Sequence, residues 1–156
     1  MSVETVRAYL NAFGRGGDIR EFSESSATVE LAAKAVGVEP ARIAKTLSFE
    51  NGEGCLLIVA AGDRKIDNSK FKAAFHMKAK MLSPDRALAL TGHAVGGVCP
   101  FALPEGVPVY LDESLRRFAT VFPACGSSNS AIELTCEDLA ACSRCSSWVD
   151  VTKPME

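Results

Sequence analysis

Two glycine-containing segments carry residues that are well suited to holding a reactive ligand. In the first segment, residues 91–101, Gly96 and Gly97 stand together ahead of Pro100 and Phe101. Adjacent glycines let the backbone approach a ligand closely, because no side chain stands in the way. Pro100 fixes the exit of the loop, and Phe101 could form one wall of a small pocket. The ordinary alternative for this segment is a tight structural turn.

The second segment, residues 123–130, places Gly126 among short hydroxyl and amide side chains. Its backbone N–H groups could stabilise the oxyanion that develops during an acyl-transfer reaction, and the alternative is a polar hairpin. Lys45 adds a compact positive charge at the head of a strand-like run, where it could hold a phosphate or a ribose oxygen. An exposed lysine on a strand is the commoner case. Together these residues predict chemistry by backbone amides and a single cation.

Few other groups in the sequence are suited to catalysis. His93 lies inside the first glycine segment, where it could hydrogen-bond a ligand or brace the turn. No triad of nucleophile, base and orienting group is evident, and we expect no cofactor. Cys142 and Cys145 form one C-x-x-C pair, which is half of a zinc site at best. We therefore expect no metal site and six reduced cysteines, with a zinc or thiol-redox protein as an alternative.

Length and composition are those of a soluble globular protein with one domain over residues 1–156. No apolar run approaches the roughly 18 residues of a membrane span, and the N-terminus lacks the apolar core of a signal peptide. We therefore expect a cytoplasmic protein without membrane contacts. The net charge is −2, but residues 63–80 hold six Lys or Arg against two Asp. This basic stretch could contact nucleic-acid phosphates, or it could be a solvated helix with its flanks.

Periodicity and capping residues predict five helices, over residues 3–13, 29–36, about 68–75, 84–91 and about 136–142. Asn51-Gly52 predicts a hairpin between strands at 43–49 and 55–61. Further strands are expected at 18–22, 107–111, 118–124, 131–135 and 148–151, with a helical turn over 112–117. Because the strands do not alternate regularly with long helices, we predict an α+β fold with a mixed, curved, barrel-like central β-sheet and peripheral helices.

The order of Lys45, the Gly96-Gly97-x-x-Pro100-Phe101 loop and Gly126 resembles the YbaK/prolyl-tRNA synthetase-associated domain family. The resemblance extends over about residues 4–150. It implies the fold of that family and a trans-acting aminoacyl-tRNA deacylase, which hydrolyses the ester of a mischarged tRNA. The implied substrate is tRNA-Pro carrying cysteine, alanine, serine or 2-aminobutyrate, with prolyl-tRNA synthetase as a possible partner and no DNA. The alternative is a non-catalytic module that binds a tRNA acceptor end or a nucleotide.

The resemblance also implies roles for individual residues. It assigns catalysis to Lys45, Gly97 and Gly126. The substrate-binding residues that we expect are Val29, Thr46, Leu47, His93, Gly96, Pro100, Phe101, Cys125, Ser127 and Asn129. Those expected to contact tRNA are Arg64, Lys65, Lys70 and Lys72. Thr46 replaces an asparagine of some family members, and residues 124–127 lack a histidine that some members have there. Both differences concern the choice of amino acid.

Overall fold

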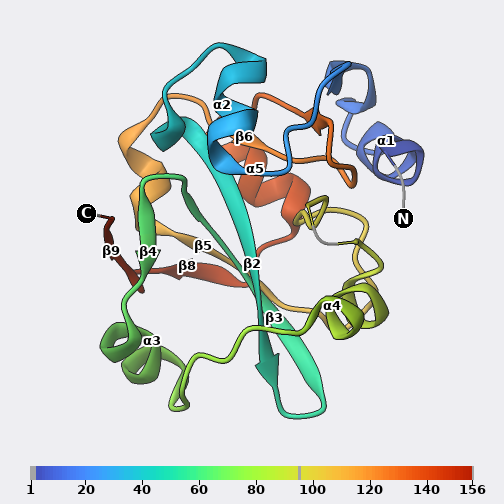
Figure 1. Cartoon of the computed structure of the whole chain (residues 1–156). Helices are drawn as coiled ribbons and strands as arrows, with labels where there is room; N and C mark the ends of the chain where they lie inside the picture. Colours follow the sequence, from blue (N-terminus) through green and yellow to red (C-terminus); the bar gives the residue numbers. More distant parts are fainter. Residues whose placement is uncertain (1–2, 95, 156) are drawn as a thin grey trace.

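The computed structural model describes residues 3–94 and 96–155, and its centre is a curled, five-stranded sheet (Figure 1). The strand order is β6-β2-β3-β5-β8. These strands are Phe122–Pro123, Ile43–Asn51, Gly54–Ala61, Val109–Asp112 and Ser147–Val149, in that order. β2 and β3 are antiparallel, whereas the β6–β2, β3–β5 and β5–β8 pairs are parallel. The predicted α+β fold with a mixed, curved sheet is confirmed.

The β2–β3 hairpin forms the long axis of the sheet. Its register pairs Asn51 with Gly54, so the two-residue turn is Gly52-Glu53, one residue later than an Asn51-Gly52 turn, and Gly52 takes a positive φ of 63°. β3 is buried from residue 55 to residue 61 because both of its faces are covered. Leu57 and Val59 pack into the larger core, whereas Leu56 and Ile58 pack into a second core with Phe71 on the other face. β2 is thereby held rigidly against β3.

Five helices surround the sheet in the described part of the chain: α1 Val3–Asn11, α2 Val29–Val36, α3 Asn68–Phe75, α4 Pro84–Thr91 and α5 Cys136–Ser143. Four of them begin at a side-chain cap, because Thr28, Asp67, Ser83 and Thr135 each accept a backbone N–H from the first turn. The five predicted helices are therefore confirmed to within two residues at their ends. None of these described helices has the length and hydropathy needed to cross a membrane.

The shorter strands differ more from the prediction. The strands expected at 118–124 and 131–135 reduce to β6 and to β7 (Ser130–Ala131), with an isolated bridge between Val121 and Leu134. β7 leaves the main sheet because it pairs with β1 (Arg20–Glu21), and β1 follows a 3₁₀ turn at Gly16–Asp18. A second small ribbon, β4 (Arg64–Ile66) with β9 (Thr152–Pro154), was not predicted, since its polar residues show no apolar alternation.

Candidate active site

The two glycine segments lie directly against each other. A Cβ atom added to Gly97 would lie 2.9 Å from the Gly126 carbonyl carbon and 2.9 Å from the Ser127 nitrogen. Both of those atoms belong to the backbone, so no side chain at position 97 fits without separating the loops. Gly96 has a φ of +92°, and its added Cβ would lie 3.3 Å from the Ala27 Cβ. The glycines at 96 and 97 therefore allow three chain segments to converge.

A cavity of about 200 Å³ opens beside this junction. Its walls come from the start of α2 and the residues before it, from β2, from residues 81–87 and from the two glycine segments. Of the predicted site residues, the cavity brings together Val29, Lys45, Thr46 and Gly96. Most of the remaining wall is apolar, including Ala44, Phe122 and several alanines.

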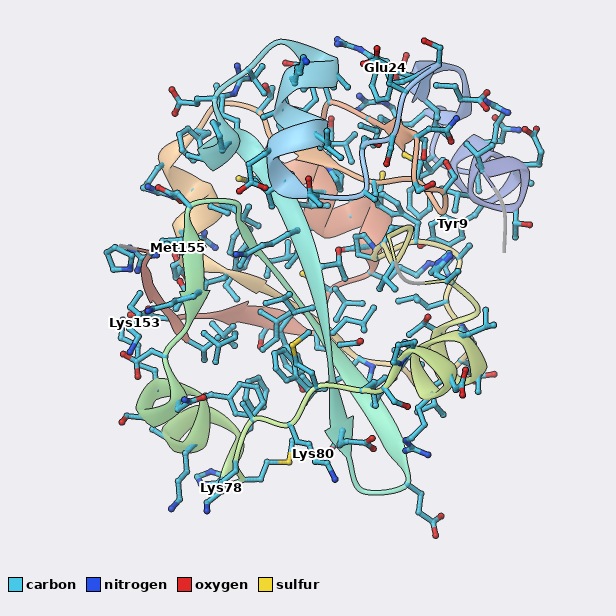
Figure 2. The ribbon with its side chains drawn as sticks, in the orientation of Figure 1. Tyr9, Glu24, Lys78, Lys80, Lys153 and Met155 are labelled. Atoms are coloured by element: carbon cyan, nitrogen blue, oxygen red, sulfur yellow. The ribbon has the colours of Figure 1, made fainter. Side chains whose placement is uncertain are left out.

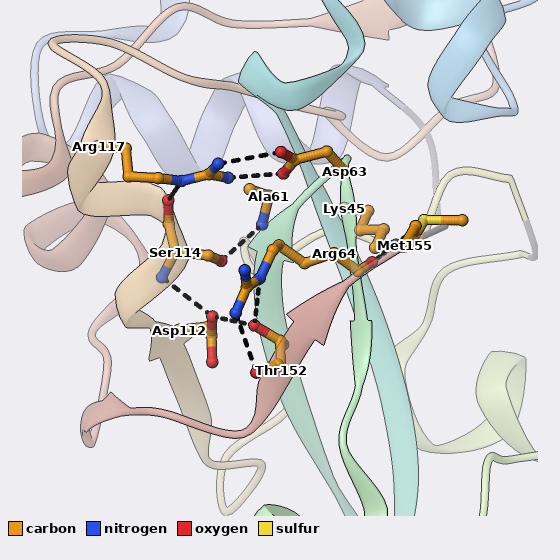
Figure 3. A network of polar contacts seen from close by, with 9 residues as sticks. All are labelled: Lys45, Ala61, Asp63, Arg64, Asp112, Ser114, Arg117, Thr152 and Met155. Carbon is orange, nitrogen blue, oxygen red and sulfur yellow. Dashed lines mark hydrogen bonds and ion pairs between the residues drawn. The ribbon is translucent and has the colours of Figure 1, made fainter.

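Lys45 reaches this cavity from β2, where it pairs with Ala60 of β3. Its Nζ donates a hydrogen bond to the carbonyl oxygen of Arg64 and lies 3.9 Å from the sulfur of Met155 (Figure 3). Within residues 3–94 and 96–155, no carboxylate lies within ion-pair distance of this ammonium. Burial lowers the pKa of Lys45, and the charges of Asp63 and Glu30 oppose that shift. A half-buried ammonium with three donors and these two neutral neighbours is suited to binding an anionic or strongly polar ligand.

His93 braces the first glycine segment from inside. Its ring is fully buried, and Nε2 lies 2.8 Å from the carbonyl oxygen of Phe101, so the ring connects the two ends of the loop. Burial lowers the pKa of His93, which keeps the ring neutral. Phe101 is also fully buried and packs with Tyr9 in the larger core, at 6.4 Å between ring centroids. Neither side chain lines the cavity, although both were expected to contact the substrate.

One of the expected backbone donors is used inside the protein. The Gly97 N–H donates to the carbonyl oxygen of Ala94 at 2.9 Å, and the Gly126 backbone lowers the pKa of the buried Cys99 thiol against the larger, opposite effect of burial. The catalytic role expected for Gly97 and Gly126 stays a prediction, and in this structure the Gly97 N–H already has a partner. Their observed role is the close packing of one loop on the other, which only glycine at position 97 allows.

The other residues expected in the second glycine segment hold its shape. The Ser127 hydroxyl donates to Asn129 at 2.9 Å and to Ser130 at 2.8 Å, and the Asn129 amide donates to the carbonyl oxygen of Phe22 at 2.9 Å. Cys125 is fully buried, and burial raises the pKa of its thiol well above the ordinary value. Leu47 packs into the second core, away from the cavity, and Pro100 is buried. None of Leu47, Pro100, Cys125, Ser127 and Asn129 lines the cavity.

The four residues expected to contact tRNA divide into two pairs. Arg64 donates to the hydroxyl and carbonyl oxygens of Thr152, and Lys70 donates to Asp150 and to the Thr152 carbonyl oxygen. Both are thus engaged within the protein, whereas Lys65 and Lys72 are exposed. Lys72 and Lys78 line a second hollow at α3. Figure 2 shows Lys78, Lys80 and Lys153 projecting outward at the periphery.

The cysteines do not assemble a reactive cluster in the described part of the chain. All six are free thiols, and no group of three or more His, Cys, Asp or Glu side chains there could hold a metal ion. Burial raises the pKa of Cys99 to about 12 and also raises the pKa of Cys142 and of Cys145. Protonated thiols are poor nucleophiles and poor metal ligands, which weighs against the zinc and thiol-redox alternative.

Sequence reasoning missed two parts of the site. The carbonyl group of Arg64 and the side chain of Met155 contact Lys45, and they come from β4 and from the residue that follows β9, two strands that had no sequence signature. Ala27, which meets Gly96, directly precedes Thr28, the cap of α2, and no contact between this position and the first glycine segment was predicted. A backbone carbonyl is common to all residues, so no residue type could have identified it.

Comparison with known proteins agrees with this geometry. Residues 23–142 match the model of the aminoacyl-tRNA editing domain. "Uncharacterized protein YwhH" of Bacillus subtilis (strain 168) is 55% identical, over 100% of both chains. "Putative Cys-tRNA(Pro)/Cys-tRNA(Cys) deacylase EbsC" of Enterococcus faecalis (strain ATCC 700802 / V583) is 31% identical, over 74% of this chain and 72% of that protein.

A solved structure is similar over nearly the whole length. It is described as a "putative trans-editing enzyme for prolyl tRNA synthetase", and it superposes with a TM-score of 0.87 at 29% identity. The similarity covers 97% of this chain and 96% of that one. The fold, the meeting of the glycine segments and the matched sequence thus agree, and the chain belongs to the aminoacyl-tRNA editing domain family, whose YbaK-like members it was expected to resemble.

Proposed function

We propose that this protein is a trans-acting deacylase that hydrolyses the ester bond between a small amino acid and a mischarged tRNA. The observation that carries the proposal is the cavity that joins Lys45 to the first glycine segment. Its volume of about 200 Å³ is below the roughly 300–1,000 Å³ of sites for drug-sized ligands. The aminoacyl group is the part of the substrate that such a space suits, and the nucleic acid stays outside.

Lys45 is the residue that anchors the end of the tRNA in this proposal. Lys45 lines the cavity, and its partly buried ammonium has no carboxylate partner among the described residues. A phosphate or ribose oxygen of the terminal adenosine would supply the missing polar partner. A hydrogen bond to a charged group typically contributes about 1.5–3 kcal/mol, so this contact alone can position the ester.

The chemistry required of the protein is modest, because an aminoacyl ester is already an activated acyl group. We assign the Ser127 N–H, which lies beside Gly97, to the oxyanion of the tetrahedral intermediate. One such donor is typically worth about 2.7–4 kcal/mol in acyl-transfer enzymes. Water, or a group of the substrate itself, attacks the carbonyl carbon. Collapse of the tetrahedral intermediate then breaks the bond between the carbonyl carbon and the ribose oxygen, and the proton lost by the attacking group goes to that oxygen, which becomes a hydroxyl of the tRNA again.

The proposed substrates are tRNA-Pro species that carry alanine, cysteine, serine or 2-aminobutyrate. The names of the relatives support tRNA-Pro, and prolyl-tRNA synthetase is the proposed partner. The cavity supports a small side chain, because its volume is only about 200 Å³ and Val29, Ala44 and Phe122 line it together with Thr46. Exclusion by size is effective against larger residues, whereas one methylene discriminates by only about 1–3 kcal/mol.

A panel of mischarged tRNAs tests this proposal and separates it from a non-catalytic binding module. The assay measures free amino acid released from alanyl-, cysteinyl-, seryl- and prolyl-tRNA-Pro. A deacylase releases at least one of the small amino acids faster than spontaneous hydrolysis does and leaves prolyl-tRNA-Pro largely intact. Binding of every tRNA without any release would instead identify a binding module.

A further inference from the structure

The ribbon formed by β4 and β9 supplies both neighbours of the Lys45 ammonium. The carbonyl group that accepts its hydrogen bond belongs to Arg64, the first residue of β4. The sulfur atom at 3.9 Å belongs to Met155, which directly follows β9 and whose N–H donates to the carbonyl oxygen of Asp63 at 3.0 Å. The position of the ammonium therefore depends on how firmly this ribbon is held.

A buried carboxylate holds the ribbon to the main sheet. Asp112, at the end of β5, is 1% exposed, and its Oδ1 accepts the Val151 N–H at 2.9 Å. Its Oδ2 accepts the Ser114 N–H at 3.0 Å and the Thr152 hydroxyl at 2.7 Å. A buried carboxyl group that accepts three hydrogen bonds is well satisfied and resists displacement.

Thr152 connects this carboxylate to β4. The same Thr152 hydroxyl that donates to Asp112 accepts from Arg64 Nε at 3.1 Å, and the Thr152 carbonyl accepts from Arg64 Nη2 at 3.0 Å (Figure 3). The hydroxyl thus uses its one hydrogen toward Asp112 and a lone pair toward the guanidinium. The path runs from Asp112 through Thr152 to Arg64, whose carbonyl group contacts Lys45.

Thr152 also lies outside the part of the chain that matches the editing-domain model. That match ends at residue 142 and includes Lys45, Arg64 and Asp112, whereas β8 and β9 follow it. We propose that Thr152 is a positioning residue for Lys45, and that the C-terminal strand β9 is a functional part of the editing site. The catalytic consequence of this inference rests on the proposed function.

A purely structural role for Thr152 predicts a different result. The β4–β9 ladder is a pairing of backbone groups, so a purely structural role of the Thr152 side chain would lower the melting temperature without changing the pKa of Lys45 in the folded protein. A positioning role changes the environment of Lys45 in the folded protein. Burial is the main influence on Lys45, opposed by Asp63 and Glu30, so release of the ammonium moves its pKa upward toward the ordinary value.

Two variants of Thr152 separate these roles. Thr152→Val keeps the shape but loses the hydroxyl, and Thr152→Ser keeps the hydroxyl. We would follow Lys45 by NMR titration of its ε-carbon in the folded proteins and measure single-turnover release of the amino acid from the best substrate of the tRNA panel. Thr152→Val should raise the Lys45 pKa and slow release about five- to tenfold, the range of one lost hydrogen bond. Thr152→Ser should match the wild type in both.

If Thr152→Val and Thr152→Ser give the same Lys45 titration and the same release rate as each other, the inference is overturned. If Thr152→Val does not fold, Arg64→Met replaces it, because this variant removes the guanidinium contacts and leaves the carbonyl group. In Arg64→Met we likewise expect a higher Lys45 pKa and slower release of the amino acid. The absence of both changes would also contradict the inference. A shifted Lys45 titration in a protein that deacylates no tRNA would refute the proposed function but not the positioning role.

Discussion

At the scale of single residues, Gly97 lies at a position where a side chain has no space. We expect Gly97→Ala to separate the two glycine segments, because the new methyl group would lie 2.9 Å from backbone atoms of Gly126 and Ser127. Overpacking of this kind typically costs about 1–3 kcal/mol. Thermal unfolding and the deacylation assay should both show the loss. Gly17→Ala is the matched control, because its added Cβ meets nothing within 4 Å, and it should leave both unchanged.

His93 makes stability depend on pH. Burial lowers the pKa of His93 in the folded protein, so the unfolded chain, with a pKa of about 6.5, binds a proton more readily. The contribution to stability is complete above about pH 6.5 and is lost as the pH falls toward the folded pKa. Urea unfolding at pH 7.5 and pH 5.5 should show this decrease in the wild type. The decrease should be smaller in His93→Gln, which cannot titrate, and an equal decrease in both would contradict the assignment.

At the scale of elements, capped helices and the long hairpin were predictable because their signals are local. Thr28 and Asp67 cap the helices that follow them, and the hairpin that Asn51-Gly52 predicted turns at Gly52 and Glu53 between β2 and β3. The β4–β9 ribbon was not predictable, because residues 64–66 and 152–154 are mostly polar and pair across a long sequence separation. The same distinction between local signals and long-range pairing applies to the candidate site. The glycine segments were recognised, whereas the carbonyl contact to Lys45 depends on the ribbon.

The hairpin turn gives a prediction about an element away from the cavity. Gly52 has a φ of +63°, a conformation in which a side chain is strained. Gly52→Ala should therefore lower the stability by about 1 kcal/mol and leave the deacylation rate unchanged, because the cavity lies at the other end of β2. Thermal unfolding and single-turnover release measure the two effects. A slower rate with unchanged stability would show that the turn contributes to the site.

At the scale of the whole molecule, the net charge of −2 means that tRNA binding depends on where the basic residues are placed. Lys72 and Lys78 are exposed around the second hollow, whereas Lys70 is paired with Asp150. We expect Lys72→Ala combined with Lys78→Ala to weaken tRNA binding and reduce its salt dependence by about 0.7–0.9 in log–log slope per residue. Lys70→Ala should change the slope less. Filter binding between low and physiological salt measures both, and equal slopes would exclude this face.

The central claim is that the Lys45 ammonium beside a small cavity makes this fold an editing enzyme. Its most direct test is the single-turnover rate of amino acid release from mischarged tRNA-Pro, for the wild type, Lys45→Ala and the exposed control Lys34→Ala. Loss of a hydrogen bond to a charged group of about 1.5–3 kcal/mol predicts a rate roughly ten- to a hundredfold lower for Lys45→Ala. Lys34→Ala should match the wild type. Full activity in Lys45→Ala would contradict the account.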